Sequence, residues 1–167
     1  MPAADPSAYL SDIHHHTALL HDPPEALENA LIHPRLLIVG PSATAFLRHV
    51  AFLWCSGLED AKTYSLLFPI FIPLAELPKH VDSHEPLIDY LGTQSGQRNW
   101  GLAASYFREK LAAAFLLLDG LADVHEAHRQ PVRRLIEEAA AAWPHSRIIV
   151  ATQLPDGALA GFHTVFV

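Results

Sequence analysis

The feature that most constrains the fold is a run of apolar residues at 115–118 that leads directly into Asp119 and Gly120. A second apolar run, at 36–39, leads into Gly40. Uninterrupted apolar runs of this length are typical of strands in a parallel sheet, because helices cover both of their faces. The two runs therefore predict two buried strands, each with a glycine or an acidic residue at its carboxyl end.

Helical patterns alternate with the predicted strands, which favours an α/β fold with a parallel sheet and right-handed crossovers. Apolar spacing and the usual start and stop residues predict helices over 43–55, 83–92, 99–112 and 131–143, after short helices at 6–20 and 25–31. Further strands are predicted at 68–74, 147–152 and 164–167. The prolines in 68–74 place that strand at an edge of the sheet, because proline lacks the N–H that a central strand needs. We predict one domain over 35–167 with a helical lead-in over 1–34.

Composition restricts the function classes. The chain has 167 residues, half of them hydrophobic, which suffices for one core. Its formal charge of -7 argues against nucleic acid as a partner, because phosphate binding depends on Lys and Arg. The sequence shows no signal peptide and no apolar stretch of about 18 residues, so no membrane is expected. The single cysteine fits a reducing compartment, and we predict a cytoplasmic protein.

The segment that follows the first strand has part of a phosphate-binding loop. The motif G-x-x-x-x-G-K-[ST] needs a second glycine and a lysine, and neither follows Gly40 here. Thr44 stands where the motif has its Mg²⁺-binding hydroxyl, and Ala43 stands where it has lysine. A phosphate loop works through a ring of backbone N–H groups and the lysine ammonium. The sequence therefore predicts at most weak phosphate binding, by Gly40, Ser42 and Thr44.

Four segments, over roughly residues 35–155, make the chain resemble a NACHT-type domain of the STAND class of P-loop NTPases. They are Phe-Leu-Arg-His-Val-Ala at 46–51, Phe-Pro-Ile-Phe-Ile-Pro-Leu at 68–74, Leu-Leu-Leu-Asp-Gly-Leu-Ala-Asp-Val at 116–124 and Ala-Thr-Gln-Leu-Pro at 151–155. The resemblance implies a P-loop NTPase-like three-layer fold, with a mostly parallel sheet of four to five strands flanked by helices.

The same resemblance assigns roles to acidic residues and shows where the chain departs from the family. It implies that Asp119 is the Walker B ligand of Mg²⁺ and that Asp123 stands where the family has the glutamate that polarises the attacking water. Asp is one methylene shorter than Glu, which can leave a base out of hydrogen-bond reach. Ala122 replaces a second family acid, and Gln153 replaces an arginine. The departures fall where hydrolysis would occur.

Two functions follow as expectations. The first is a degenerate, non-hydrolysing NACHT/STAND-like domain, a pseudoenzyme that binds a protein partner or a second copy of itself in signalling or defence. The alternative is an atypical switch that binds ATP or GTP with Mg²⁺ on Asp119, uses Asp123 as base, and takes its missing cation from Arg48 or a partner chain. A third possibility is a decayed remnant without a selected activity.

Histidines offer a metal hypothesis beside these. The best set is His125 and His128 next to Asp119 and Asp123, since imidazole and carboxylate suit Zn or Mn. Other histidines cluster at 14–16 and at 80 and 84. A metal site needs ligands that converge in space, and proximity in sequence does not provide this, so the sequence favours ordinary surface histidines.

Overall fold

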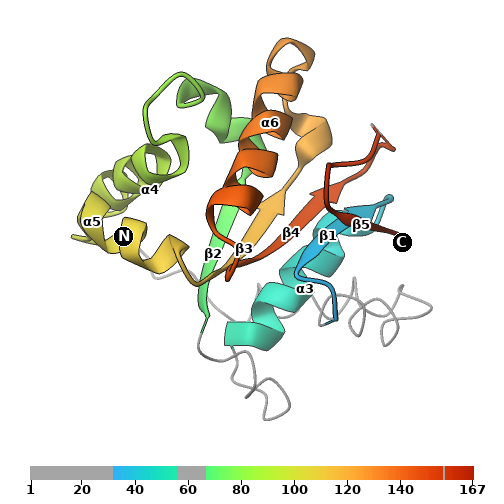
Figure 1. Cartoon of the computed structure of the whole chain (residues 1–167), viewed down its shortest axis with the longest axis horizontal. Coiled ribbons are helices and arrows are strands. Elements are labelled where there is room, and N and C mark those ends of the chain that lie inside the picture. The colour runs from blue at the N-terminus through green and yellow to red at the C-terminus, as the bar shows by residue number, and fades with distance from the viewer. Residues whose placement is uncertain (1–31, 56–66, 156) are drawn as a thin grey trace, which may run out of the picture.

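A five-stranded sheet forms the centre of the protein, whose computed structural model describes residues 32–55, 67–155 and 157–167 (Figure 1). The strands are β1 (Arg35–Val39), β2 (Phe68–Pro73), β3 (Ala114–Asp119), β4 (Arg147–Thr152) and β5 (His163–Phe166). Their order is β2-β3-β4-β1-β5, and every neighbouring pair is parallel. The predicted α/β fold with a largely parallel sheet is confirmed.

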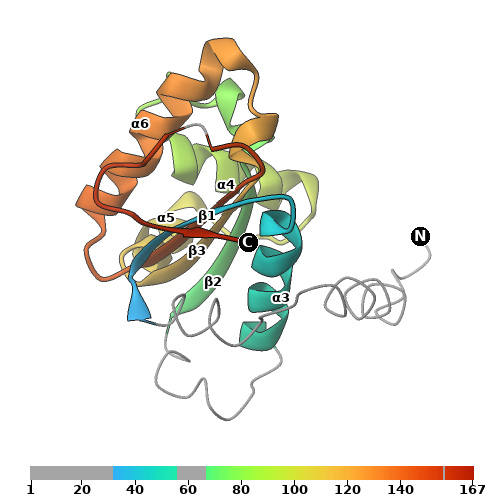
Figure 2. The same cartoon turned by 90° about the vertical axis from the view of Figure 1, so that its right-hand side faces the viewer.

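Helices cover both faces of this sheet (Figure 2). They are α3 (Ala43–Cys55) on one face and α4 (Pro86–Gln97), α5 (Ala104–Leu111) and α6 (Glu126–Ala142) on the other. Two short 3-10 helices, η2 (Leu74–Lys79) and η3 (Leu121–Asp123), follow β2 and β3. Alternate residues of β1 separate the two core clusters: Leu36 and Ile38 pack with α3, whereas Leu37 and Val39 face the other three helices. The result is the predicted three-layer arrangement.

The strands follow the predicted pattern closely. All six residues of β3 are buried, as a strand covered on both faces requires. β2 lies at an edge of the sheet with Pro69 and Pro73 in it, which confirms the edge position that the prolines predict.

Three helices differ from the prediction in where they begin or end. The helix predicted from Ser83 to Gly92 is α4, which begins at Pro86 and continues past Gly92 to Gln97. The start is set by Pro86, because a residue before proline is pushed out of the α region. Gly92 does not end the helix, since no left-handed residue follows it there.

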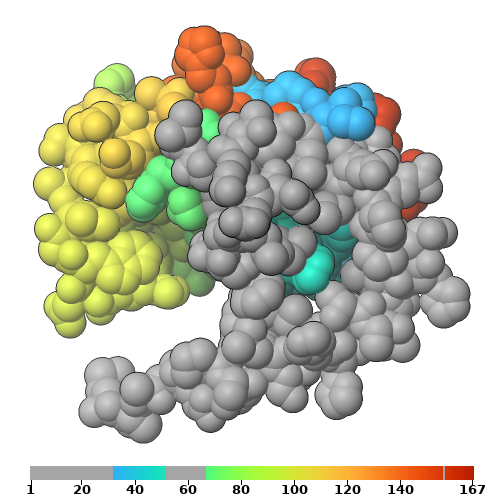
Figure 3. Space-filling model, turned by 90° about the horizontal axis from the view of Figure 1, so that it is seen from below, coloured from blue at the N-terminus to red at the C-terminus, as the bar shows by residue number. Residues whose placement is uncertain are grey.

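The helix predicted to begin at Asn99 begins instead at Ala104, as α5. Asn99 and Gly101 have positive φ angles of 54° and 70°, which are incompatible with a right-handed helix. The yellow residues of this loop and of α5 form one flank of the surface in Figure 3.

The last predicted helix is α6, which begins at Glu126, upstream of Pro131. His125 caps it, because its Nδ1 accepts a hydrogen bond from the N–H of Ala127 at 3.3 Å. The helix ends at Ala142 before Pro144, as predicted. The predicted helices at 6–20 and 25–31 lie outside the described residues. Within the described ranges, no helix has the length and apolarity needed to cross a membrane.

Candidate functional site

The connection between β1 and α3 is too short to form a phosphate loop. It has three residues, Gly40, Pro41 and Ser42. The carbonyl of Gly40 accepts a hydrogen bond from the N–H of Ala43 at 3.1 Å, so the chain turns directly into the helix. That bond occupies an N–H group which a phosphate loop would direct toward its ligand. The structure therefore lacks the ring of free N–H groups that cradles a phosphate.

The end of β4 positions the two segments that form the candidate site, the one after β1 and the one after β3. β4 lies between β1 and β3. Its Thr152 carbonyl accepts a hydrogen bond from the Gly40 N–H at 3.0 Å, and its Ala151 carbonyl accepts one from the Gly120 N–H at 3.1 Å. The segments that follow β1 and β3 are thereby held side by side at the carboxyl edge of the sheet.

Thr44 and Asp119 meet at this edge. The Thr44 hydroxyl, in the first turn of α3, donates a hydrogen bond to Oδ1 of Asp119 at 2.8 Å. Asp119 is buried, with 8% of its surface exposed. The structure thus brings together the two residues that the sequence places in one Mg²⁺ site. A hydroxyl and a carboxylate are oxygen donors that suit Mg²⁺, but the adjoining loop does not fit the phosphates of a nucleotide.

The surroundings of Asp119 shift its acidity in both directions. Burial raises the pKa of the Asp119 carboxyl above its ordinary value, and repulsion from Asp123 raises it further. The hydrogen bond from Thr44, the positive charge of Arg48 and the N–H of Gly120 act against this rise. Burial has the largest influence, so the pKa remains raised. Arg48 is therefore the cation that acts on this carboxylate.

Replacing Asp119 with asparagine should stabilise the protein at neutral pH. Since the folded state holds the Asp119 proton more tightly than the unfolded chain does, stability falls as the pH rises from the ordinary value of 3.8 through the raised pKa. Asparagine removes this effect and keeps an oxygen that accepts from Thr44. We expect a gain of about 0.5–2 kcal/mol at pH 7, the usual range of a stabilising substitution. Urea denaturation at pH 4 and pH 7 measures it.

That gain should shrink as the pH falls through the raised pKa of Asp119, because the carboxyl of the folded wild type then takes up a proton. A variant that is less stable than the wild type at pH 7 would show that the carboxylate contributes stability, contrary to this account. Thr44→Val is the companion variant, because it removes the donor and leaves the acid.

The other predicted site residues lie near this pair but differ in exposure. Asp123 is exposed in η3, and its N–H donates to the Gly120 carbonyl at 3.0 Å. Gly120 has a φ of 76°, and a β-carbon there would meet the Asp123 carboxylate. Asp123 therefore folds back toward the end of β3. Ser42 is half-buried, and Gln153 is exposed.

One contact at this edge has no signal in the sequence. The backbone of Val167 runs against Gly40, because its N–H donates to the Val39 carbonyl at 2.9 Å. Gly40 has a φ of 145°, and a β-carbon there would collide with the Val167 carbonyl. The close neighbour of this glycine is therefore the backbone of the residue that follows β5.

The histidine hypothesis fails where the structure tests it. His125 uses its Nδ1 as a helix cap, and its ring lies 6.3 Å from that of His128, centre to centre. Among the described residues, no three His, Cys, Asp or Glu side chains gather to hold a metal ion. The histidines at 14–16 lie outside those residues.

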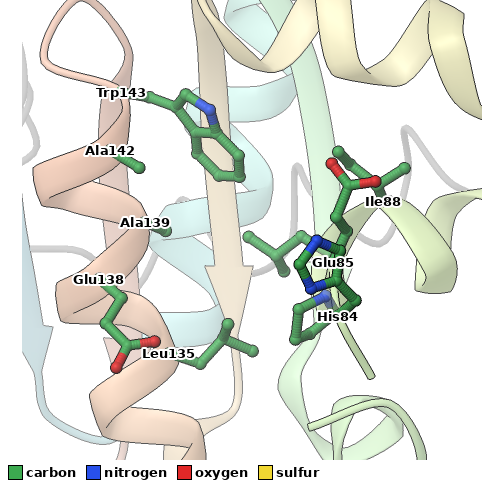
Figure 4. A pocket seen from close by; sticks show the side chains of 10 residues that line it. His84, Glu85, Ile88, Leu135, Glu138, Ala139, Ala142 and Trp143 are labelled. Carbon is green, nitrogen blue, oxygen red and sulfur yellow. The ribbon is translucent and has the colours of Figure 1, made fainter. Parts of the chain in front are cut away.

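An apolar hollow opens elsewhere on the surface, between the start of α4 and the end of α6 (Figure 4). Its cavity volume is about 190 Å³. The apolar side chains in its wall are Pro86, Leu87, Ile88, Leu135, Ala139, Ala142 and Trp143. This hollow is a second candidate site, distinct from the carboxyl edge of the sheet.

No protein-family model, curated protein or solved structure matches this chain.

Proposed function

We propose that the chain is a non-hydrolysing, NACHT/STAND-like domain of the cytoplasm that acts by binding another protein, in signalling or defence. The observation that carries this proposal is the three-residue loop whose Ala43 N–H donates back to Gly40. Such a loop offers neither the lysine nor the N–H ring of an NTPase. The Thr44–Asp119 hydrogen bond then acts as a structural joint between α3 and β3.

The size of the lost electrostatic contribution to the rate supports the absence of hydrolysis. An electrostatic contact to the transferring group commonly contributes about 10²–10³ in rate, and the lysine that makes it in the family is missing. The amino terminus of α3 remains as a partial positive charge, but such a charge contributes only about 1 kcal/mol at an exposed site. The remaining groups do not replace what is lost.

The second candidate is a weak Mg²⁺-dependent switch that binds ATP or GTP. Two observations favour it: the 2.8 Å approach of Thr44 to Asp119, and the position of Arg48, whose charge acts on that carboxylate. In this case Gly40 and Ser42 would contact phosphate, and Asp123 would serve as base if hydrolysis occurred.

Thermal unfolding in the presence of nucleotides separates the two. We expect no shift in Tm with millimolar ATP, ADP or GTP, with or without Mg²⁺, because the loop cannot cradle a phosphate. A ligand at a hundredfold excess over its Kd stabilises by about 2.7 kcal/mol. For a protein of this size that corresponds to a Tm shift of roughly 5–10 °C, well above the error of the method.

The control is the Asp119→Ala variant under the same conditions. A Mg²⁺-dependent shift in the wild type that this variant loses would refute the proposal and establish the nucleotide switch. A shift that Asp119→Ala retains would point to nucleotide binding away from Asp119, and it would contradict the proposal equally.

A further inference from the structure

The hollow between α4 and α6 has apolar walls and open access. Figure 4 shows the Trp143 indole at one end and Leu135 at the other, with Ile88 across from them. Leu135 and Trp143 are only half-buried, although both pack against the core. The wall between them consists of two alanines, Ala139 and Ala142. Small residues between two large ones leave the space unfilled.

The volume of the hollow sets the size of its occupant. A cavity of about 150 Å³ accommodates benzene, and this one measures about 190 Å³. It therefore fits a single phenylalanine or leucine side chain. Protein interiors are close-packed, so an apolar space of this size at the surface gains contacts when such a side chain enters.

Charge at the rim restricts which residues can lie beside that side chain in a docked segment. Two acids border the hollow, Glu85 and Glu138. Glu85 forms an ion pair with Arg108, whose Nε donates to its Oε1 at 3.0 Å, and this partner lowers the pKa of Glu85. Glu138 is exposed and makes no ion pair or hydrogen bond within the described part of the chain. His84 also lies at the rim. With histidine counted as neutral, the unpaired charge of the rim is that of Glu138, on a protein whose formal charge of -7 is counted in the same way.

We propose that this hollow docks a segment of another protein that presents one phenylalanine or leucine beside a lysine or arginine. The apolar side chain enters between Leu135 and Trp143, and the cation meets Glu138. The inference rests on the proposed partner-binding function and names the chemistry of that partner. A second copy of this chain is a weaker fit, because two negatively charged molecules repel each other.

The test uses the indole N–H signal of Trp143 in the ¹⁵N–¹H NMR spectrum of the full chain, assigned with the Trp143→Phe variant. The probes are short alanine-based helical peptides: one with a central phenylalanine flanked by lysines, one flanked by glutamates, and one with lysines but alanine in place of phenylalanine. The lysine and phenylalanine peptide should shift the Trp143 signal. The peptide without phenylalanine should bind at least about tenfold more weakly, because it loses the apolar contact. The glutamate peptide should bind about fivefold more weakly, because it replaces an exposed ion pair with Glu138 by a like-charge contact.

Matched variants separate docking from general effects. Ala142→Leu should fill the hollow and weaken the first peptide about tenfold, whereas Ala141→Leu places the same side chain on the next residue, outside the hollow, and should leave binding unchanged. Both alanines are exposed at the end of α6, so stability should change by less than about 0.5 kcal/mol in either case. Glu138→Lys should reverse the preference in favour of the glutamate peptide.

The proposal is overturned if no peptide shifts the Trp143 signal, or if Ala141→Leu and Ala142→Leu weaken binding equally. It is also overturned if the signal moves with protein concentration alone, which would identify a second copy as the occupant. Nucleotide binding in the thermal assay would refute the proposed function and leave the peptide result intact. If no peptide shifts the Trp143 signal and no nucleotide shifts the Tm, the docking site is refuted and the proposed function is not.

Discussion

Replacing Phe115 with alanine should lower the free energy of unfolding by about 3–5 kcal/mol, the usual loss for a buried phenylalanine. Phe115 lies in β3 with 1% of its surface exposed, and it belongs to the core cluster on the α3 side together with Phe46 and Leu47. Removing its ring leaves a cavity beneath α3. Urea denaturation of the variant and the wild type measures the loss, provided that the m-value is unchanged.

The matched control is Phe166→Ala in β5, because Phe166 is 73% exposed. This substitution removes the same atoms and should change stability by less than about 0.5 kcal/mol. Equal losses in the two variants would mean that α3 does not pack on β3 as described. The comparison also concerns the site, since α3 carries Thr44 to its hydrogen bond with Asp119.

The strands were predictable because their signal is local. Four consecutive apolar residues at 115–118 leave a chain little choice but a strand covered on both faces, and β3 is buried throughout. The prolines of β2 restrict it to an edge for an equally local reason, the missing N–H.

The helix boundaries were less predictable because they depend on weaker preferences. Gly92 ends a helix only if the backbone turns left-handed there, and α4 continues through it instead. Pro131 is a common first residue of a helix, yet α6 accommodates it in its interior after the cap at His125. At Asn99 the φ of 54° is a tertiary outcome that spacing does not show.

The candidate site also has a part that the sequence predicts and a part that it does not. The phosphate-loop motif and the family resemblance place Thr44 and Asp119 in one Mg²⁺ site, and in the structure their side chains meet in a 2.8 Å hydrogen bond. The contact of Val167 with Gly40 could not be predicted, because it depends on the register of β5 against β1. The strand order, which places β4 between β3 and β1, is likewise a property of the whole sheet.

Replacing Gly40 with alanine is the second substitution with a large expected effect. Gly40 has a φ of 145°, where a residue with a β-carbon is strained by about 1–3 kcal/mol. The new β-carbon would also collide with the Val167 carbonyl, and forcing a group into a packed space costs about 1–3 kcal/mol more. We expect a total loss of about 2–6 kcal/mol, measured as a lower midpoint of urea denaturation.

Gly92→Ala is the control for Gly40→Ala. Gly92 lies within α4 and has no atom near the position of its missing β-carbon, so alanine should stabilise the helix there by about 0.5–1 kcal/mol. Opposite signs for the two glycines would show that the fold requires glycine at position 40, where the backbone of Val167 lies close. If Gly40→Ala instead kept full stability, Val167 could not lie against Gly40 as described, and the space beside this glycine would be open to a phosphate. The stability of this one variant therefore bears on the choice between a partner-binding domain and a nucleotide switch.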